Sequence, residues 1–136
     1  MRNSFDKIVV SPKSGPKAIG PYSVGMIANH FVFTAGQIGL DPASGNLVEG
    51  GIQAETRQAL INLRTILEEA GASLDHVVKT TVFLRDMNEF GAMNATYGEF
   101  FTQNPPARST VQVVLPKGAA VEIEAVAVLP NEEHND

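Results

Sequence analysis

The sequence predicts an α+β fold in which two helices lie on one face of a mixed, six-stranded sheet. Two observations support this fold class. Segments rich in β-branched or alternating residues and segments with helical periodicity follow one another in the order βββαβαββ, without a linker or repeat. The last segment, "VEIEAVAV", also alternates so that one side of the strand is entirely apolar, as expected beneath a layer of helices.

Three strands are predicted before the first helix. Their segments, "KIVV", "SVGMIAN" and "FVFTAGQI", are rich in residues that favour extended backbone. Only the turn-forming Asn29 and His30 separate the second from the third, which predicts a hairpin. The expected strands cover residues 7–10, 23–29 and 31–38.

A long helix is predicted over residues 51–70, after a loop of turn-forming composition at residues 41–46. Gly71 is well placed to end this helix, because glycine adopts the left-handed backbone common just beyond helix C-termini. The apolar residues that recur at helical spacing are Ala59, Leu60, Leu63, Ile66, Leu67 and Ala70.

The second half of the chain predicts a strand, a helix and two more strands. The strand at residues 76–84 is followed by "DMNE", in which Asp86 and Glu89 have the spacing of a capping box. The next helix carries Asn94 on the edge of an apolar stripe, and residues 109–115 and 121–128 form the final strands. The stripe consists of Phe90, Met93, Tyr97, Phe100 and Phe101.

The last strand has an unusual second face. It begins with two carboxylates, Glu122 and Glu124, and then turns apolar at Val126 and Val128. This pattern fits a face that packs against another subunit, but it also fits two glutamates that are solvated near a strand end. The opposite face, which the helices are expected to cover, carries Val121, Ile123, Ala125 and Ala127.

Composition limits the classes of function. The 136 residues are 43% hydrophobic and 18% charged, and the net charge of −5 argues against a protein that binds nucleic-acid backbones. The chain has no cysteine, and its three histidines lack metal-ligand spacing, so we expect neither a thiol nucleophile nor a metal. No signal segment or apolar run of membrane-spanning length is present, so a cytoplasmic protein without membrane contact is expected.

Arg108 stands out in "NPPARSTVQVV" because no acidic residue is near it in the sequence. A guanidinium beside apolar sequence needs water or an anion, since an unpaired charge in a low-dielectric place costs several kcal/mol. Either water or an anion from outside the protein meets this need.

Several motifs together resemble the RidA family of enamine/imine deaminases. They are "AIGPYSVG", "FTAGQIGLDPASGNL", "KTTVFLRDMNEFGAMNATYGEFF", "PPARSTVQV" and "VEIEAVAV". The resemblance implies a single RidA-like domain over residues 1–136, with a chorismate-mutase-like fold. It also implies a homotrimer with sites between subunits. The implied reaction is hydrolysis of 2-iminobutanoate, 2-iminopropanoate and similar imines, such as those derived from 2-aminoacrylate, to 2-keto acids and ammonia without cofactor or metal.

The resemblance also assigns the catalytic residues. Arg108 falls on the family's substrate-binding arginine, and a planar guanidinium suits a carboxylate through two parallel hydrogen bonds. Glu122 falls on the position of the acid/base, with Glu124 on the same face as the competing choice. Burial would raise the carboxyl pKa of Glu122 and a nearby Arg108 would lower it, and both outcomes are open.

The remaining implied substrate-binding residues are Tyr22, Gly36, Asn94 and Thr110. Two positions depart from the family pattern. Ala35 stands where many members have serine, which removes a hydroxyl contact, and Thr110 stands where cysteine is common. Thr110 in place of cysteine alters the rate or the substrate range only if the side chain, rather than the backbone, acts at that position.

A hairpin of the last two strands would leave Arg108 and Glu122 about 20 Å apart, at roughly 3.3 Å per residue. One small acid cannot contact both, so either these strands are not neighbours or the two residues come from different chains. Two other functions stay open: a binding module for small ligands such as 2-keto acids, and an endoribonuclease or translation inhibitor.

Overall fold

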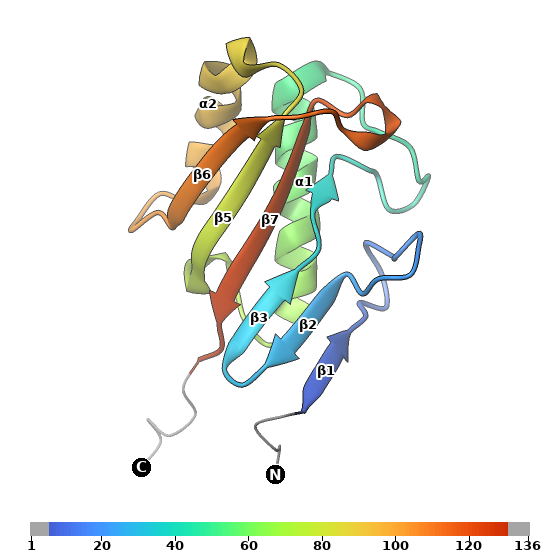
Figure 1. Cartoon of the computed structure of the whole chain (residues 1–136), viewed down its shortest axis with the longest axis vertical. Coiled ribbons are helices and arrows are strands. Elements are labelled where there is room, and N and C mark those ends of the chain that lie inside the picture. Colours follow the sequence, from blue (N-terminus) through green and yellow to red (C-terminus); the bar gives the residue numbers. More distant parts are fainter. Residues whose placement is uncertain (1–5, 131–136) are drawn as a thin grey trace.

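The sheet has one face covered by helices and one face open (Figure 1). The computed structural model describes residues 6–130. Its helices are α1 (Gly51–Glu69) and α2 (Phe90–Phe100), with 3₁₀ turns η1 (Leu74–His76), η2 (Met87–Glu89) and η3 (Pro116–Gly118). Its strands are β1 (Lys7–Val10), β2 (Gly25–Ala28), β3 (Phe31–Thr34), β4 (Gln37–Ile38), β5 (Val77–Leu84), β6 (Ala107–Gln112) and β7 (Val121–Val128). No helix in this part of the chain is long and apolar enough to cross a bilayer.

Strand order confirms the predicted mixed sheet. The main path runs β1-β2-β3-β7-β5-β6, and the short β4 also pairs with β7. Strands β5 and β6 run parallel, because α2 carries the chain back between them, and the other described pairs are antiparallel. Strand β5 lies between β6 and β7, so the last two strands are not a hairpin.

The core lies between the sheet and the helices. Its largest fully buried side chains include Leu60, Leu63 and Ile66 of α1, which pack over the sheet. The predicted covered side of β7 is confirmed, since each of its members is 3% exposed or less. These members are Val121, Ile123, Ala125 and Ala127.

Helix α1 ends as the sequence predicts. Gly71 has φ +93°, and the amide of Ala72 donates to the carbonyl of Leu67 at 2.8 Å while the amide of Gly71 donates to Glu68 at 3.1 Å. These two bonds form a Schellman motif, which satisfies carbonyls that the helix end leaves open.

The strand expected at residues 31–38 is broken in the structure. Phe33 pairs with Val126 and Gln37 pairs with Ile123, so residues 34–36 oppose only residues 124 and 125 of β7. The extra residue makes a bulge. The hydroxyl of Thr34 accepts the amide hydrogen of Ala125 at 3.0 Å, so a side chain replaces a lost backbone bond.

Two other expectations need correction. Asp86 accepts the amide of Asn88 at 3.0 Å and so caps the turn η2, whereas Glu89 makes no capping bond and faces Arg85 instead, so the reciprocal capping box is wrong. Strand β6 covers residues 107–112 instead of 109–115, which places Arg108 within the strand. The parallel pairing with β5 decides these limits.

A buried hydroxyl pair joins α2 to β5 and can be tested. The oxygens of Thr80 and Tyr97 are 2.7 Å apart. We predict that Tyr97→Phe costs about 1–3 kcal/mol of unfolding free energy, because it leaves the Thr80 hydroxyl buried without its partner. Urea denaturation at one fixed protein concentration measures the loss. The double variant Tyr97→Phe with Thr80→Val should lose little more unfolding free energy than Tyr97→Phe alone. If the losses of the two single variants instead add up in the double variant, the pairing is contradicted.

Candidate active site

A cavity of about 500 Å³ opens beside the central strand, between the chain before β2, the segment around β4, and η3. This volume is within the range of small-molecule sites. The cavity contains Glu122 together with Gly36 and Tyr22, three residues that the sequence predicts for the site, and also Ala35. Its other lining residues include Pro16, Lys17, Ile38, Asp41, Asn62 and Lys117.

The bulge between β3 and β4 brings Gly36 against the Glu122 side chain. A Cβ built on Gly36 would lie 2.7 Å from Cδ of Glu122 and closer still to its Oε2. Real Cβ atoms do not approach other atoms so closely. Glycine is therefore required here because it leaves room for the carboxyl group.

Burial raises the pKa of the Glu122 carboxyl above its ordinary value, and the nearby charge of Glu124 raises it further. Both effects penalise the ionised form, the first through lost hydration and the second through like-charge repulsion. A carboxyl group with a raised pKa exchanges a proton more readily near neutral pH. The sequence left open whether burial or the charge of Arg108 controls the pKa of Glu122. Within one chain burial is the main cause, and Arg108 is not among the causes.

Tyr22 and Ala35 form part of the cavity wall. Tyr22 is 46% exposed, and its hydroxyl accepts the amide hydrogen of Ile19 at 3.3 Å. That bond holds the phenol beside the turn that carries it. Ala35 donates its amide to Val24 at 2.9 Å and presents only a methyl group, as its sequence predicts.

Arg108 lies outside this cavity, on β6. Its guanidinium carbon is 4.8 Å from the ring centre of Tyr97 and 5.5 Å from that of Phe90, both on α2. Cation–π contacts of this kind stabilise a guanidinium without neutralising it. Arg108 forms no ion pair with an acidic residue between positions 6 and 130.

Asn94 and Thr110 belong to the same region as Arg108. Asn94 lies between Phe90 and Tyr97 on one side of α2, and its buried Oδ1 has no hydrogen-bond partner within the described residues. Thr110 follows Arg108 by two positions on β6 and therefore faces the same side of the sheet. The predicted site residues thus divide into two groups.

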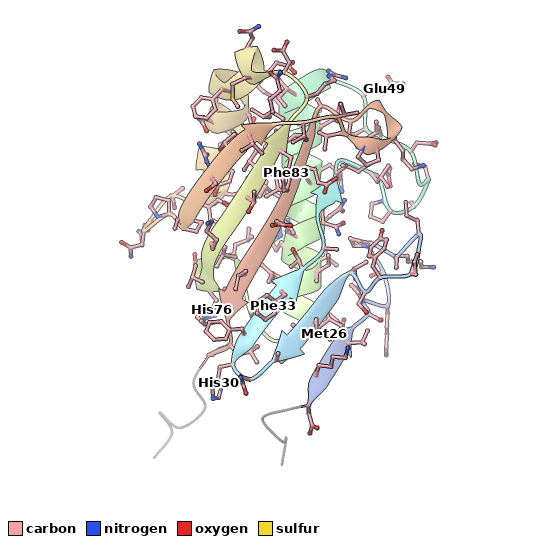
Figure 2. All side chains as sticks on the ribbon, viewed as in Figure 1. Met26, His30, Phe33, Glu49, His76 and Phe83 are labelled. Carbon is pink, nitrogen blue, oxygen red and sulfur yellow. The ribbon has the colours of Figure 1, made fainter. Side chains whose placement is uncertain are left out.

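The two groups lie on opposite faces of the sheet. Arg108 pairs with Thr80, whose hydroxyl reaches α2, so Arg108 is on the helical face. Glu122 pairs with Phe83, one of the two phenylalanines that Figure 2 labels on the open face. From the sequence, only the distance along the strands between Arg108 and Glu122 was predicted, whereas the structure also places the two residues on opposite faces. Within one chain, Arg108 and Glu122 cannot contact the same small molecule.

Sequence reasoning missed two residues that shape the cavity from α1. Asn62 is 2% exposed, and its amide donates to the carbonyls of Ile38 at 3.3 Å and Leu40 at 2.9 Å, which holds β4 against the helix. Glu55 is 7% exposed and accepts the amide hydrogen of Ala120 at 2.8 Å. A polar residue on the apolar side of a helix was the available signal in both cases.

No group of three or more histidine, aspartate or glutamate side chains within residues 6–130 is arranged to hold a metal ion. The carboxyl group of Glu122 is a group that can accept and donate a proton, and it lines a cavity of small-molecule size.

Comparisons with known proteins show the family to which the chain belongs. The family model described as endoribonuclease L-PSP matches residues 12–129. The chain is 47% identical over 127 residues to the 2-iminobutanoate/2-iminopropanoate deaminase of Homo sapiens, covering 93% of both proteins. It is 43% identical to the YjgF gene product of E. coli, with a TM-score of 0.84 over 89% of this chain and 98% of that one. E. coli TdcF with bound serine is 38% identical, with a TM-score of 0.86 over 90% and 99% of the chains.

The fold and the cavity define a chorismate-mutase-like α+β protein with a small-molecule site beside its central strand. The chain belongs to the endoribonuclease L-PSP family, also known as the YjgF/RidA family.

Gly36→Ala should damage the site more than the fold. The added methyl group must displace the Glu122 carboxyl, so we predict a loss of imine hydrolysis of about tenfold or more with a melting temperature within a few degrees of wild type. The matched control is Gly98→Ala on α2, where a Cβ meets nothing within 4 Å and activity should be unchanged. Full activity in Gly36→Ala would contradict the close packing.

Proposed function

We propose that this protein hydrolyses 2-imino acids, such as 2-iminobutanoate and 2-iminopropanoate, to 2-keto acids and ammonia without a cofactor. The observation that carries the proposal is the half-buried Glu122, whose pKa is raised, in a cavity of small-molecule size. The human relative with 47% identity is named for this activity.

The reaction needs a proton removed from water and a proton given to nitrogen. In the proposed mechanism Glu122 accepts a proton from water as the oxygen attacks C2, and then protonates the nitrogen. As the resulting carbinolamine collapses, its hydroxyl proton passes through the same carboxyl group to the amine nitrogen, the C=O bond forms, the C–N bond breaks and ammonia leaves. A raised pKa lowers the free-energy cost of protonating this carboxyl group, which favours its holding the proton before it passes to nitrogen.

The substrate carboxylate is proposed to bind Arg108 of a neighbouring copy in a homotrimer. Arg108 and Glu122 lie on opposite faces of one chain, so a shared site requires a second copy. The open face offers an apolar surface for assembly, since Phe31 and Phe33 are each 43% exposed on β3. On the helical face, the buried Oδ1 of Asn94 has no hydrogen-bond partner within residues 6–130, and we propose that Asn94 and Thr110 accompany Arg108.

The family description also names an endoribonuclease. The net charge of −5 does not favour RNA, because backbone binding relies on clustered cations that release counterions. The deciding experiment generates the imine enzymatically and follows keto-acid formation with and without this protein, alongside a salt-dependent RNA-binding assay. Acceleration of imine hydrolysis supports the proposal, and RNA cleavage without it would overturn the proposal.

Glu122→Gln should slow hydrolysis by roughly a hundredfold or more, because an amide cannot accept the proton from water. Glu124→Gln is the matched control on the same strand face. It should retain most activity but lower the Glu122 pKa, since it removes a like charge. Because the base acts when ionised, the acidic limb of the kcat/KM profile should then move to lower pH. If Glu124→Gln is the more damaging change, the assignment is wrong.

Mixing two inactive variants tests the shared site. Arg108→Ala alone should lower kcat/KM by about 30- to 4,000-fold, the cost of removing one partner of a charge-assisted pair. After subunit exchange with Glu122→Gln, random equal mixing leaves about one site in four with both native residues, so about a quarter of wild-type activity should return.

The control for that experiment is each variant exchanged with itself. A differential tag followed by mass spectrometry verifies that mixed oligomers have formed. No recovery in verified mixed oligomers would mean that Arg108 and Glu122 do not meet across subunits, and a purely monomeric protein in light scattering would contradict the assembly itself.

A further inference from the structure

Two exposed lysines line the cavity and have no assigned task. Lys17 comes from the segment before β2 and Lys117 from η3, and both line the cavity that contains Glu122. Between residues 6 and 130 neither lysine forms an ion pair. The cavity's other acidic residue, Asp41, uses its Oδ1 to accept the amide hydrogen of Ala43 at 2.9 Å. Among the described residues, therefore, no acidic side chain competes with an anionic ligand for either ammonium group.

The backbone at Lys117 is unusual for a residue with a side chain. Lys117 has φ +58° and Gly118 has φ +67°, so two consecutive residues adopt left-handed conformations. Glycine does this freely, whereas lysine does so at a cost. Such backbone persists only where the surroundings determine it, and it concentrates at functional sites.

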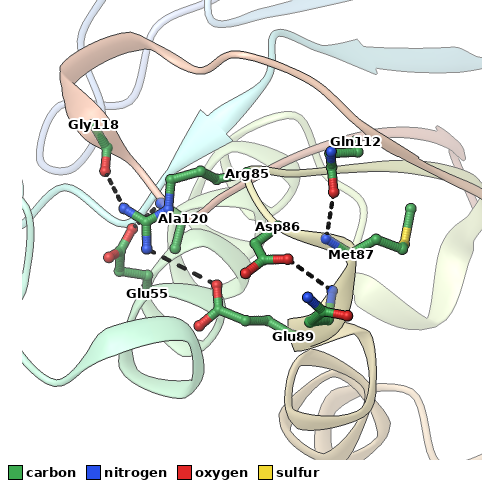
Figure 3. A network of polar contacts seen from close by, with 9 residues as sticks. Glu55, Arg85, Asp86, Met87, Glu89, Gln112, Gly118 and Ala120 are labelled. Atoms are coloured by element: carbon green, nitrogen blue, oxygen red, sulfur yellow. Dashed lines mark hydrogen bonds and ion pairs between the residues drawn. The ribbon is translucent and has the colours of Figure 1, made fainter.

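Hydrogen bonds hold this segment in place (Figure 3). The guanidinium of Arg85 donates to the carbonyl of Gly118 at 2.9 Å, and the backbone amide of Arg85 donates to the carbonyl of Ala120 at 3.0 Å. Glu55 accepts the amide hydrogen of Ala120 at 2.8 Å. Ala119 and Ala120 are fully buried. The backbone that carries Lys117 is therefore fixed relative to β7 and its Glu122.

The cavity is larger than a short-chain imino acid requires. Its volume of about 500 Å³ falls within the range that accommodates drug-sized ligands, whereas 2-iminobutanoate ends in a single ethyl group. In the proposed mechanism the α-carboxylate is bound by Arg108 of a neighbour and the imine carbon lies at Glu122. The side chain of the substrate is then the part left to contact the other cavity residues.

We propose that Lys117 is a specificity-determining residue that binds a second carboxylate at the end of the substrate side chain, so that the enzyme accepts imino dicarboxylic acids. This inference rests on the proposed imine hydrolysis and names a further substrate class for the same site. An ammonium donates charge-assisted hydrogen bonds to a carboxylate and offers nothing comparable to a methyl group. Lys17 lines the same cavity and supplies a second positive charge.

The test compares two substrate pairs in which a terminal carboxylate replaces a methyl group. These pairs are 2-iminosuccinate with 2-iminobutanoate, and 2-iminoglutarate with 2-iminopentanoate. D-aspartate oxidase forms the acidic imines and D-amino-acid oxidase forms the neutral ones, and semicarbazide trapping reports the imine that remains. The variants are Lys117→Met and Lys117→Arg, with Lys13→Met as a control because Lys13 is exposed and does not line the cavity.

Wild type should hydrolyse both members of at least one pair. Lys117→Met should lower kcat/KM for the acidic member by roughly 10- to 100-fold and change the neutral member less than about twofold. Lys117→Arg should retain most of the acidic activity, because it keeps the charge. Lys13→Met should match wild type on both.

The other outcomes separate this inference from the function beneath it. Hydrolysis of the neutral imines without either dicarboxylate would overturn the role of Lys117 and leave the deaminase proposal intact. A parallel loss on both members in Lys117→Met would make the residue structural and also overturn the inference. Hydrolysis of none of the four imines would overturn the proposed function itself.

Discussion

Strand β7 pairs with β3, β4 and β5, and its alternate side chains are buried against the helices. This burial fixes the register of the sheet, because a slip of one residue would move the buried set to the open face. The same alternation forces Glu122 and Glu124 onto that open face, where hydration is lost only in part. The position of the proposed acid/base is therefore a consequence of how the core packs.

The neighbours of β7 then turn this position into a cavity. The bulge at residues 34–36 brings a glycine backbone against Glu122, and Asn62 holds the following segment to α1. At the start of β7, Glu55 and Arg85 fix the segment that contains Lys117. Polar side chains from the helix and from the end of β5 thus determine the cavity walls, while apolar packing determines where the cavity lies.

The helical face holds a different set of groups. Arg108 rests on the rings of Phe90 and Tyr97 and forms no ion pair with residues 6–130. These rings orient the guanidinium, and for a ligand bound there as proposed this would reduce the entropy lost on binding. A shared site between copies would place this oriented cation opposite a carboxyl group of raised pKa, so assembly and chemistry would depend on one another.

The sequence by itself determined the order of the elements, the buried side of β7 and the end of α1 at Gly71, because alternation, periodicity and glycine backbone are local properties. Motif resemblance also predicted the family, which the family model confirms. It proposed Glu122, Gly36, Tyr22 and Arg108 as site residues, and the first three of these line one cavity. Only the tertiary structure decided that β5 separates β6 from β7, that the strand at residues 31–38 breaks in a bulge, and that Arg108 and Glu122 lie on opposite faces. It also brought Lys17, Asn62 and Lys117 to one cavity. Strand pairing and loop position depend on contacts between residues far apart in the chain, and local sequence patterns do not specify those contacts.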